Sequence, residues 1–292
     1  MKRLTILLAA VMLLSLLSGC VSQEESPAIA ATTAPVYEFT SRICDGTGLT
    51  VGRLITENVS CLHDYSLNVR QVRTVEAAEL IVISGAGLEE FMEDLLQDKA
   101  VIDSSEGIEL LECTEAHDHE HDHHHAHEAD SHIWLSPDNA RQMSINICAE
   151  LTAAYPEYAG LFEENLTLLL SEIDTLKAYG ESQLSDLSSR ELITFHDGFA
   201  YLAESFDLEI LKAVEEESGS EASASELKEL ILLVRDHRIP AIFTEVNGSS
   251  SAASIITRET GIRSYPLDMA MSDANWFDAM LRNIDTLKEA LE

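Results

Sequence analysis

The chain has 292 residues, of which 52 are acidic and 18 are basic, so its formal net charge is −34. This balance excludes nucleic acid as a partner, because phosphate binding requires clustered Lys and Arg, and it favours a surface that attracts cations. The apolar content of 46% is that of a globular protein and excludes a disordered chain. At about 150 residues per domain, the length predicts two domains.

The first 19 residues have the pattern of a signal peptide. Lys2 and Arg3 precede the apolar segment 4–17, which is too short to span a bilayer comfortably. The segment ends in Leu-Ser-Gly-Cys20, which resembles a bacterial lipobox, and the alternative is an ordinary signal peptide with a nearby cysteine. Residues 20–35 are then expected to form a lipid-anchored flexible tether on the outer face of the bacterial cell membrane, with Cys20 as the lipidated residue.

Four further cysteines follow: Cys44, Cys61, Cys113 and Cys148. An even number in an exported protein permits two disulfides, and Cys44–Cys61 and Cys113–Cys148 are the candidate pairs. The alternative is buried free thiols. None of the four has CxxC spacing, so a thiolate zinc knot and a thioredoxin-type site are not expected.

Short apolar runs alternate with amphipathic stretches along the chain. In the first half we expect strands at 80–84 and 100–103 and helices at 88–96 and 137–154. In the second half the expected strands are 192–195, 209–214, 241–244 and 263–265, and the expected helices are 198–206, 225–238 (capped by Ser225), 249–260 (ended by Gly261) and 275–291. The alternation predicts two α/β lobes with mainly parallel sheets, an N-terminal lobe over 36–157 and a C-terminal lobe over 189–292.

Residues 158–188 separate the two lobes and favour a long helix. Phe162, Leu166, Leu169, Ile173 and Leu176 form an apolar seam at helical spacing. The segment is either a core helix of one lobe or a rigid strut that joins both, and its length of about 45 Å as a helix favours the strut.

Seven of the 11 histidines lie in an internal segment, which we expect to be a loop over 114–131. His-rich tracts bind divalent transition metals, and this one lacks the apolar residues needed to pack. We therefore expect many weak, exchanging sites rather than one defined site, the alternative being a solvated loop without a role. The residues concerned are His117, His119, His121, His123, His124, His125 and His127.

Three other histidines occur at expected strand ends or loop junctions, where α/β sheets gather ligands: His63, His132 and His196. A fourth, oxygen ligand is expected near a strand end of the second half, and Asp268 fits best, with Glu245 as the alternative. Three imidazoles and one carboxylate suit Zn²⁺, with Mn²⁺ possible. A complete protein ligand set favours holding the metal over catalysis. The carboxylates adjoining these histidines that are candidates to orient the rings are Asp64, Asp130 and Asp197.

The combined pattern resembles the zinc and manganese solute-binding lipoproteins of bacterial ABC transporters. The lipobox, the motif at His63, Asp130-Ser-His-Ile-Trp134, the His-rich loop, the linking helix, His196 with Phe199 and Tyr201, and Leu267-Asp268 carry this resemblance. It implies two lobes joined by a rigid helix, with the metal in the cleft between them. It also implies delivery of zinc to a membrane permease driven by a cytoplasmic ATPase, and we expect a monomer that is not an enzyme.

Three alternatives remain at this stage: a manganese-binding homologue, a metal-buffering or adhesin lipoprotein, and an exported zinc hydrolase. The hydrolase is the least favoured, because the chain has neither HExxH nor Gly-x-Ser-x-Gly.

Overall fold

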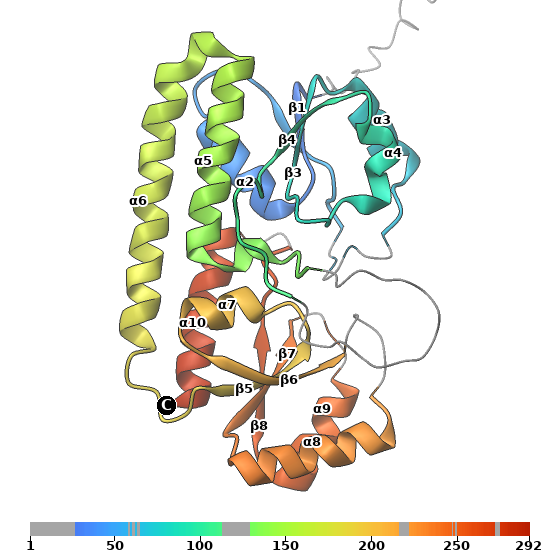
Figure 1. Cartoon of the computed structure of the whole chain (residues 1–292), viewed down its shortest axis with the longest axis vertical. Helices are drawn as coiled ribbons and strands as arrows, with labels where there is room; N and C mark the ends of the chain where they lie inside the picture. The colour runs from blue at the N-terminus through green and yellow to red at the C-terminus, as the bar shows by residue number, and fades with distance from the viewer. Residues whose placement is uncertain are drawn as a thin grey trace, which may run out of the picture.

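The computed structural model describes residues 27–57, 59, 62, 65–112, 129–215, 222–246, 248, 250–271 and 275–292. Two four-stranded sheets, each with all its strands parallel, form the centres of two lobes (Figure 1). The N-lobe sheet has the order β2-β1-β3-β4, with β1 Ile29–Ala31, β2 Val51–Arg53, β3 Leu80–Ile83 and β4 Ala100–Asp103. The C-lobe sheet has the order β6-β5-β7-β8, with β5 Glu191–His196, β6 Glu209–Glu215, β7 Ala241–Glu245 and β8 Arg263–Leu267.

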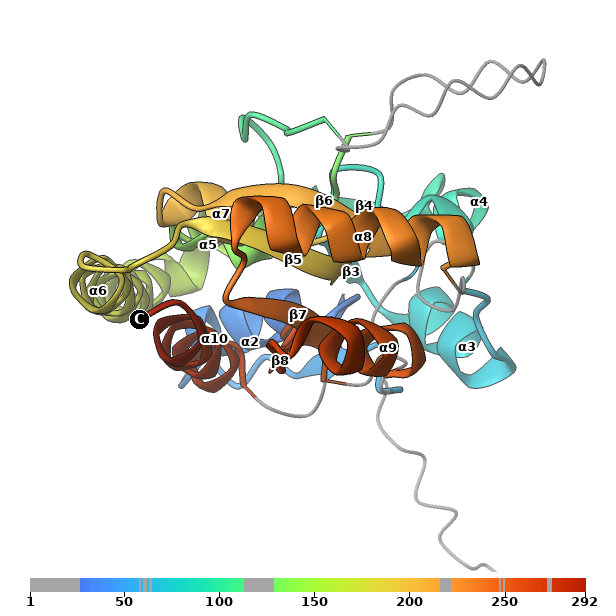
Figure 2. The same ribbon diagram turned by 90° about the horizontal axis from the view of Figure 1, so that it is seen from below.

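Helices connect the strands, as parallel pairing requires. Those of the N-terminal half are α2 Ala34–Ile43, α3 Val69–Ala77, η1 Glu90–Met92, α4 Glu93–Leu96, η2 Ile133–Leu135, α5 Pro137–Ala154 and η3 Pro156–Tyr158. Those that follow are α6 Ala159–Gln183, α7 Ala200–Ser205, α8 Ala224–His237, α9 Ser251–Thr260 and α10 Trp276–Leu291. Figure 1 shows α8 and α9 at the end of the molecule away from the N-lobe, and Figure 2, seen from that end, shows them nearest the viewer. The two α/β lobes predicted from the sequence are confirmed.

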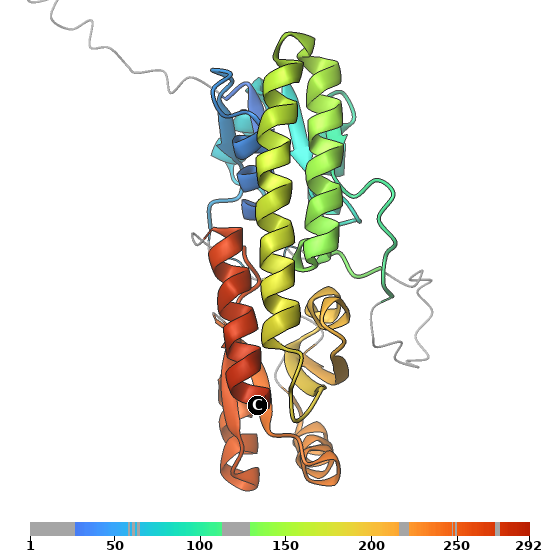
Figure 3. The same cartoon turned by 90° about the vertical axis from the view of Figure 1, so that its left-hand side faces the viewer.

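The long helix α6 runs beside both lobes and packs against α2, α5 and α10 (Figure 3). Its predicted apolar seam faces inward: Phe162, Leu169, Ile173 and Leu176 are buried, and Leu166 is half-buried. Because α6 contacts helices of both lobes, the interpretation as a strut that joins the lobes is confirmed, and the alternative of a core helix within one lobe is not. The continuous helix is shorter than predicted, because η3 occupies the start of the expected range and the helix ends at Gln183.

The expected tether does not extend to residue 35. Ile29–Ala31 form β1, which is fully buried between β2 and β3, and Pro35 stands in the first turn of α2. Proline is favoured at that position because its missing N–H has no helical partner there. The part of the predicted tether from residue 29 onward is thus the centre of the N-lobe sheet.

Two smaller expectations are also wrong. Helix α8 is capped by Ser223, not Ser225: the Ser223 hydroxyl accepts from the Glu226 amide, and the Glu226 side chain accepts from the Ser223 amide in return. Cys44 and Cys148 are buried free thiols, so the candidate disulfides that involve them are not formed. Burial, reinforced by the neighbouring Cys148, raises the pKa of the Cys44 thiol to about 12 and keeps it unreactive. Cys20, Cys61 and Cys113 lie outside the described residues.

Among the described residues, no helix has the length and apolar character needed to cross a bilayer.

Candidate metal centre

His132 lies immediately before η2, where the N-lobe chain reaches the interface with the C-lobe. Asp130, two residues earlier, accepts a hydrogen bond from the His132 backbone amide at 2.9 Å and contacts the ring Nδ1 at 2.7 Å through the same oxygen, Oδ1. Both residues are 3% exposed. The carboxylate therefore fixes the ring and leaves Nε2 pointing away, as expected for a carboxylate that orients a metal ligand.

His196 is the last residue of β5, and Glu245 is the last residue of the neighbouring strand β7. The Glu245 Oε1 lies 3.3 Å from His196 Nδ1, and both residues are buried. Gly198 lets the chain turn closely past the ring, because a Cβ there would lie 2.6 Å from Cδ2 and 2.8 Å from Nε2 of His196. The C-lobe thus presents a second imidazole backed by a carboxylate.

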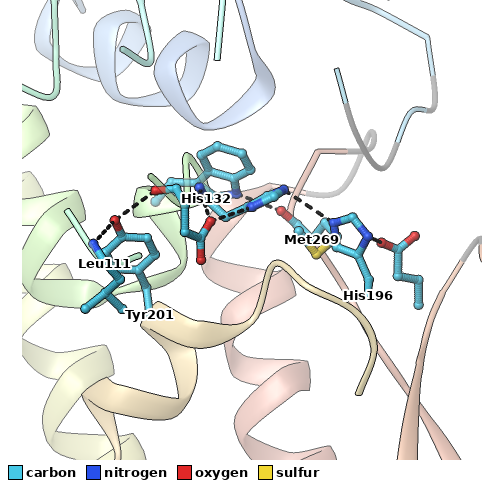
Figure 4. A network of polar contacts seen from close by, with 8 residues as sticks. Leu111, His132, His196, Tyr201 and Met269 are labelled. Carbon is cyan, nitrogen blue, oxygen red and sulfur yellow. Dashed lines mark hydrogen bonds and ion pairs between the residues drawn. The ribbon is translucent and has the colours of Figure 1, made fainter. Parts of the chain in front are cut away.

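The two imidazoles meet between the lobes (Figure 4). Their Nε2 atoms are 3.4 Å apart, and the rings are nearly perpendicular, with an angle of 89° between their planes. Two nitrogens bound to one tetrahedral zinc ion at Zn–N distances of about 2.0–2.1 Å lie about 3.3–3.4 Å apart. The same separation also permits an N–H···N hydrogen bond between the rings. The pair is spaced so that a single ion could bind both nitrogens.

The two candidate carboxylate ligands occupy different surroundings. Asp268 follows β8 and is buried, with Oδ1 accepting from the Ala270 amide at 2.8 Å and Oδ2 from Arg282 at 2.9 Å. Glu245 faces the Nδ1 of His196, the nitrogen remote from His132. Within the described parts of the chain, neither acid forms a group of three metal-binding side chains with the imidazoles.

Several predicted site residues lie outside the described residues: His63, Asp64, His117, His119, His121, His123, His124, His125 and His127. Of the two remaining carboxylates that were candidates to orient a ring, Asp130 makes the expected contact, and Asp197 is half-buried on the turn after His196. His237 is exposed, and its Nδ1 lies 3.2 Å from the Glu191 carboxylate.

The sequence analysis did not predict that Trp134 and Trp276 form hydrogen bonds between the two lobes. The Trp134 Nε1–H donates to the Met269 carbonyl at 2.7 Å, and the Trp276 Nε1–H donates to the Trp134 carbonyl at 2.8 Å. Both indoles are 1% exposed. Trp134 belongs to the motif that begins at Asp130, but a local motif cannot identify a partner as distant in sequence as Met269.

The match to known families is decisive for classification. A model described as zinc-uptake complex component A, periplasmic, matches residues 29–290. The chain belongs to this family. The zinc-binding lipoprotein AdcA of Streptococcus pneumoniae R6 is 30% identical over 313 residues, an alignment that covers 100% of this chain and 62% of that protein. The high-affinity zinc uptake system protein ZnuA of Bacillus subtilis is 28% identical over 279 residues, covering 90% of this chain and 87% of that protein.

Solved structures agree with this family assignment. A crystal structure of ZnuA superposes with a TM-score of 0.78 at 27% identity, covering 91% of this chain and 100% of that one. The Zn(II)-bound ZnuA-like domain of S. pneumoniae AdcA superposes with a TM-score of 0.76 at 26% identity, covering 91% of this chain and 99% of that one. This chain spans less than two thirds of the full AdcA sequence.

Proposed function

We propose that this protein is the extracytoplasmic zinc-binding component of an ABC importer, which captures the ion and delivers it to a membrane permease driven by a cytoplasmic ATPase. The single observation that carries the proposal is the approach of His132 and His196 from different lobes, with their Nε2 atoms 3.4 Å apart and a carboxylate on each Nδ1. The family's zinc-uptake description and the zinc named for its relatives support zinc as the cargo.

The proposed ligand set is His63, His132, His196 and Asp268. Three imidazoles and one carboxylate fill a tetrahedral zinc shell, which leaves no open position for a reacting water and suits a carrier rather than an enzyme. Glu245 then acts by orienting His196, since it faces the ring nitrogen on the far side from His132. Asp268 joins the ion by exchanging its Arg282 contact for the metal.

The remaining parts of the assembly follow from the same proposal. Cys20 carries the lipid anchor, the chain works as a monomer on the outer face of the cell membrane, and the histidines of 117–127 capture zinc weakly. The net charge of −34 concentrates cations near the surface.

Zinc binding by variants of the purified protein tests the proposal. Competition with a chromophoric chelator should give one tight site in the wild type, weakened more than about 100-fold in His132→Ala and His196→Ala, because removing even an orienting partner costs about 10- to 100-fold. Asp268→Asn should match the histidine variants, whereas Glu245→Gln should fall in the smaller range. Deletion of 117–127 should keep the tight site.

His237→Ala is the matched control, since this histidine is exposed and outside the centre. A zinc affinity unchanged in both His132→Ala and His196→Ala would refute the binding proposal. The transport step is tested separately by zinc-limited growth of a strain that lacks the protein: the wild type should restore growth and His196→Ala should not.

A further inference from the structure

The hydroxyl of Tyr201 connects the C-lobe to the chain that carries His132. Tyr201 lies on α7, five positions after His196, and is 1% exposed. Its O–H donates to the Asp130 carbonyl at 2.8 Å, and its oxygen accepts from the Leu111 amide at 2.9 Å. Figure 4 shows Leu111, Tyr201, His132 and His196 in one network of polar contacts, in which Asp130 joins Tyr201 to His132.

The two backbone groups that Tyr201 binds already lie side by side. The Asp130 amide donates to the Leu111 carbonyl at 2.8 Å, and Glu112 and Ala129 form an antiparallel bridge next to this contact. Residues 111–112 and 129–130 are therefore held together as a short pair, and the Tyr201 hydroxyl fastens that pair to the other lobe.

Asp130 transmits this restraint to the metal centre. Its carbonyl is fixed by Tyr201, and its Oδ1 holds both the backbone amide and the ring Nδ1 of His132. One strand–helix unit of the C-lobe, β5 followed by α7, thus supplies His196 directly and restrains His132 through Asp130. A change in the position of the Asp130 backbone shifts the His132 ring relative to His196.

We propose that Tyr201 is a positioning residue for the metal centre, whose hydroxyl sets the separation of the two imidazoles through the backbone of Asp130. The inference rests on the proposed function but goes beyond it, because Tyr201 is not one of the proposed ligands and its hydroxyl acts through the backbone of Asp130. Its effect belongs to the hydroxyl alone, since the ring is a buried part of the apolar core.

The variant Tyr201→Phe removes the hydroxyl and keeps the ring. The matched control is Tyr179→Phe, which removes a hydroxyl that donates to Asp285 at 2.6 Å between α6 and α10, at a half-exposed position. We expect Tyr201→Phe to weaken tight zinc binding by about threefold to tenfold, at the low end of losses for residues that orient a ligand, and Tyr179→Phe to leave it unchanged.

Two readouts separate positioning from a general loss of stability. The imidazole ¹⁵N signals of His132 should shift in folded Tyr201→Phe and stay unchanged in Tyr179→Phe. The Leu111 amide should exchange faster only in Tyr201→Phe. Unchanged zinc affinity with unchanged His132 signals in Tyr201→Phe would overturn the proposal, as would an equal loss in both variants.

The response of the Leu111 amide to zinc gives an independent check that does not depend on a Tyr201 variant. Coupling between two sites is reciprocal, so one equivalent of zinc should slow exchange of the Leu111 amide in the wild type and have no effect in His196→Ala. An equal response in both proteins, or no response in the wild type, would overturn the role of Tyr201. A wild type without tight zinc binding would instead refute the proposed function.

Discussion

At the scale of single residues, the two imidazoles have carboxylate partners of unequal strength. Asp130 makes two contacts to His132 with one oxygen, at 2.7 and 2.9 Å, whereas Glu245 reaches His196 at 3.3 Å. Short contacts to a charged acceptor are the stronger ones. The N-lobe ring is therefore the more firmly oriented of the two, and His196 has the greater freedom to adjust to an ion.

Glu89 is a second buried carboxylate, located in the N-lobe beyond the ends of β1 and β3. Its Oε1 accepts from the Thr32 hydroxyl at 2.6 Å and the Ser84 amide at 2.8 Å, and its Oε2 accepts from the Gly85 amide at 3.0 Å. Burial raises the pKa of Glu89 from 4.5 to about 7, although these hydrogen bonds act in the opposite direction.

This shift predicts a pH-dependent loss of stability. Between pH 4.5 and about 7 the folded state keeps a proton on Glu89 that the unfolded chain releases, so the free energy of unfolding falls as pH rises through this window. The contribution is fully present below pH 4.5, and its loss reaches up to about 3 kcal/mol above pH 7. Urea unfolding of the wild type and Glu89→Gln at pH 5, 6 and 7 measures it.

At low pH the Glu89→Gln variant should be less stable than the wild type, because the new NH₂ group would face the Gly85 N–H, which is also a donor. The free energy of unfolding of the variant should not show the fall with pH that Glu89 causes in the wild type. The exposed neighbour Glu90 provides the control, and Glu90→Gln should keep the wild-type slope. Identical slopes for the wild type and Glu89→Gln would contradict the assignment.

The sequence predicted that His132 and His196 approach each other but not how their carboxylate partners are arranged, and His63, the third imidazole of that prediction, lies outside the described residues. His132 and His196 flank expected helices or strands, and the rule that ligands gather at strand ends brought them together. The same rule fits Glu245 and Asp268 equally well as the carboxylate ligand. It predicts neither that Glu245 faces the Nδ1 of His196 nor that Arg282 binds Asp268. Such pairings depend on contacts between lobes, which the local pattern does not contain.

At the scale of elements, strong periodicity gave accurate bounds and weak patterns did not. Strand β4 and helix α5 have the limits predicted for them, 100–103 and 137–154. Strand β1 was missed because three residues, two of them Ala, carry little strand preference and lie among residues typical of a linker. Its burial comes from pairing with β2 and β3, which are distant in sequence.

Helix α6 contains two glycines in contrasting surroundings, which gives a matched test of its packing. A Cβ at Gly180 would lie 2.3 Å from the Phe206 ring and 3.1 Å from Ile284, whereas one at Gly160 would meet nothing within 4 Å. We expect Gly180→Ala to destabilise the protein by about 1–3 kcal/mol through overpacking, against the usual helical preference for Ala.

Gly160→Ala should be neutral or stabilise by up to about 1 kcal/mol, because only the helical preference acts there. Thermal unfolding of both variants measures the difference. A stabilised Gly180→Ala would show that α6 does not approach Phe206 as described.

At the scale of the whole molecule, the lobes share one apolar core. The main cluster of buried side chains extends from Ile29 in the N-lobe sheet to Leu291 at the end of α10, and it includes Phe162 and Leu176 of α6. A second cluster lies beneath α8 and α9 in the C-lobe. Because α6 and α10 bury their faces in the shared cluster, neither lobe can unfold without exposing apolar surface of the other.

This shared core predicts a single cooperative unfolding transition. Chemical denaturation followed by far-UV circular dichroism and by tryptophan fluorescence should give coincident midpoints, since both indoles lie between the lobes. A fluorescence change at clearly lower denaturant than the loss of secondary structure would mean that the lobes separate before they unfold.

The placement of Trp134 and Trp276 has a practical consequence. They are the only two tryptophans of the chain, and both lie where the two lobes meet. The centroid of the Trp134 ring is 5.3 Å from that of the His132 ring. Tryptophan emission, excited selectively over the seven tyrosines, therefore reports on this one region of the unlabelled protein. If zinc binds as proposed, its binding and release can be timed by stopped-flow tryptophan emission, with no dye and no engineered reporter.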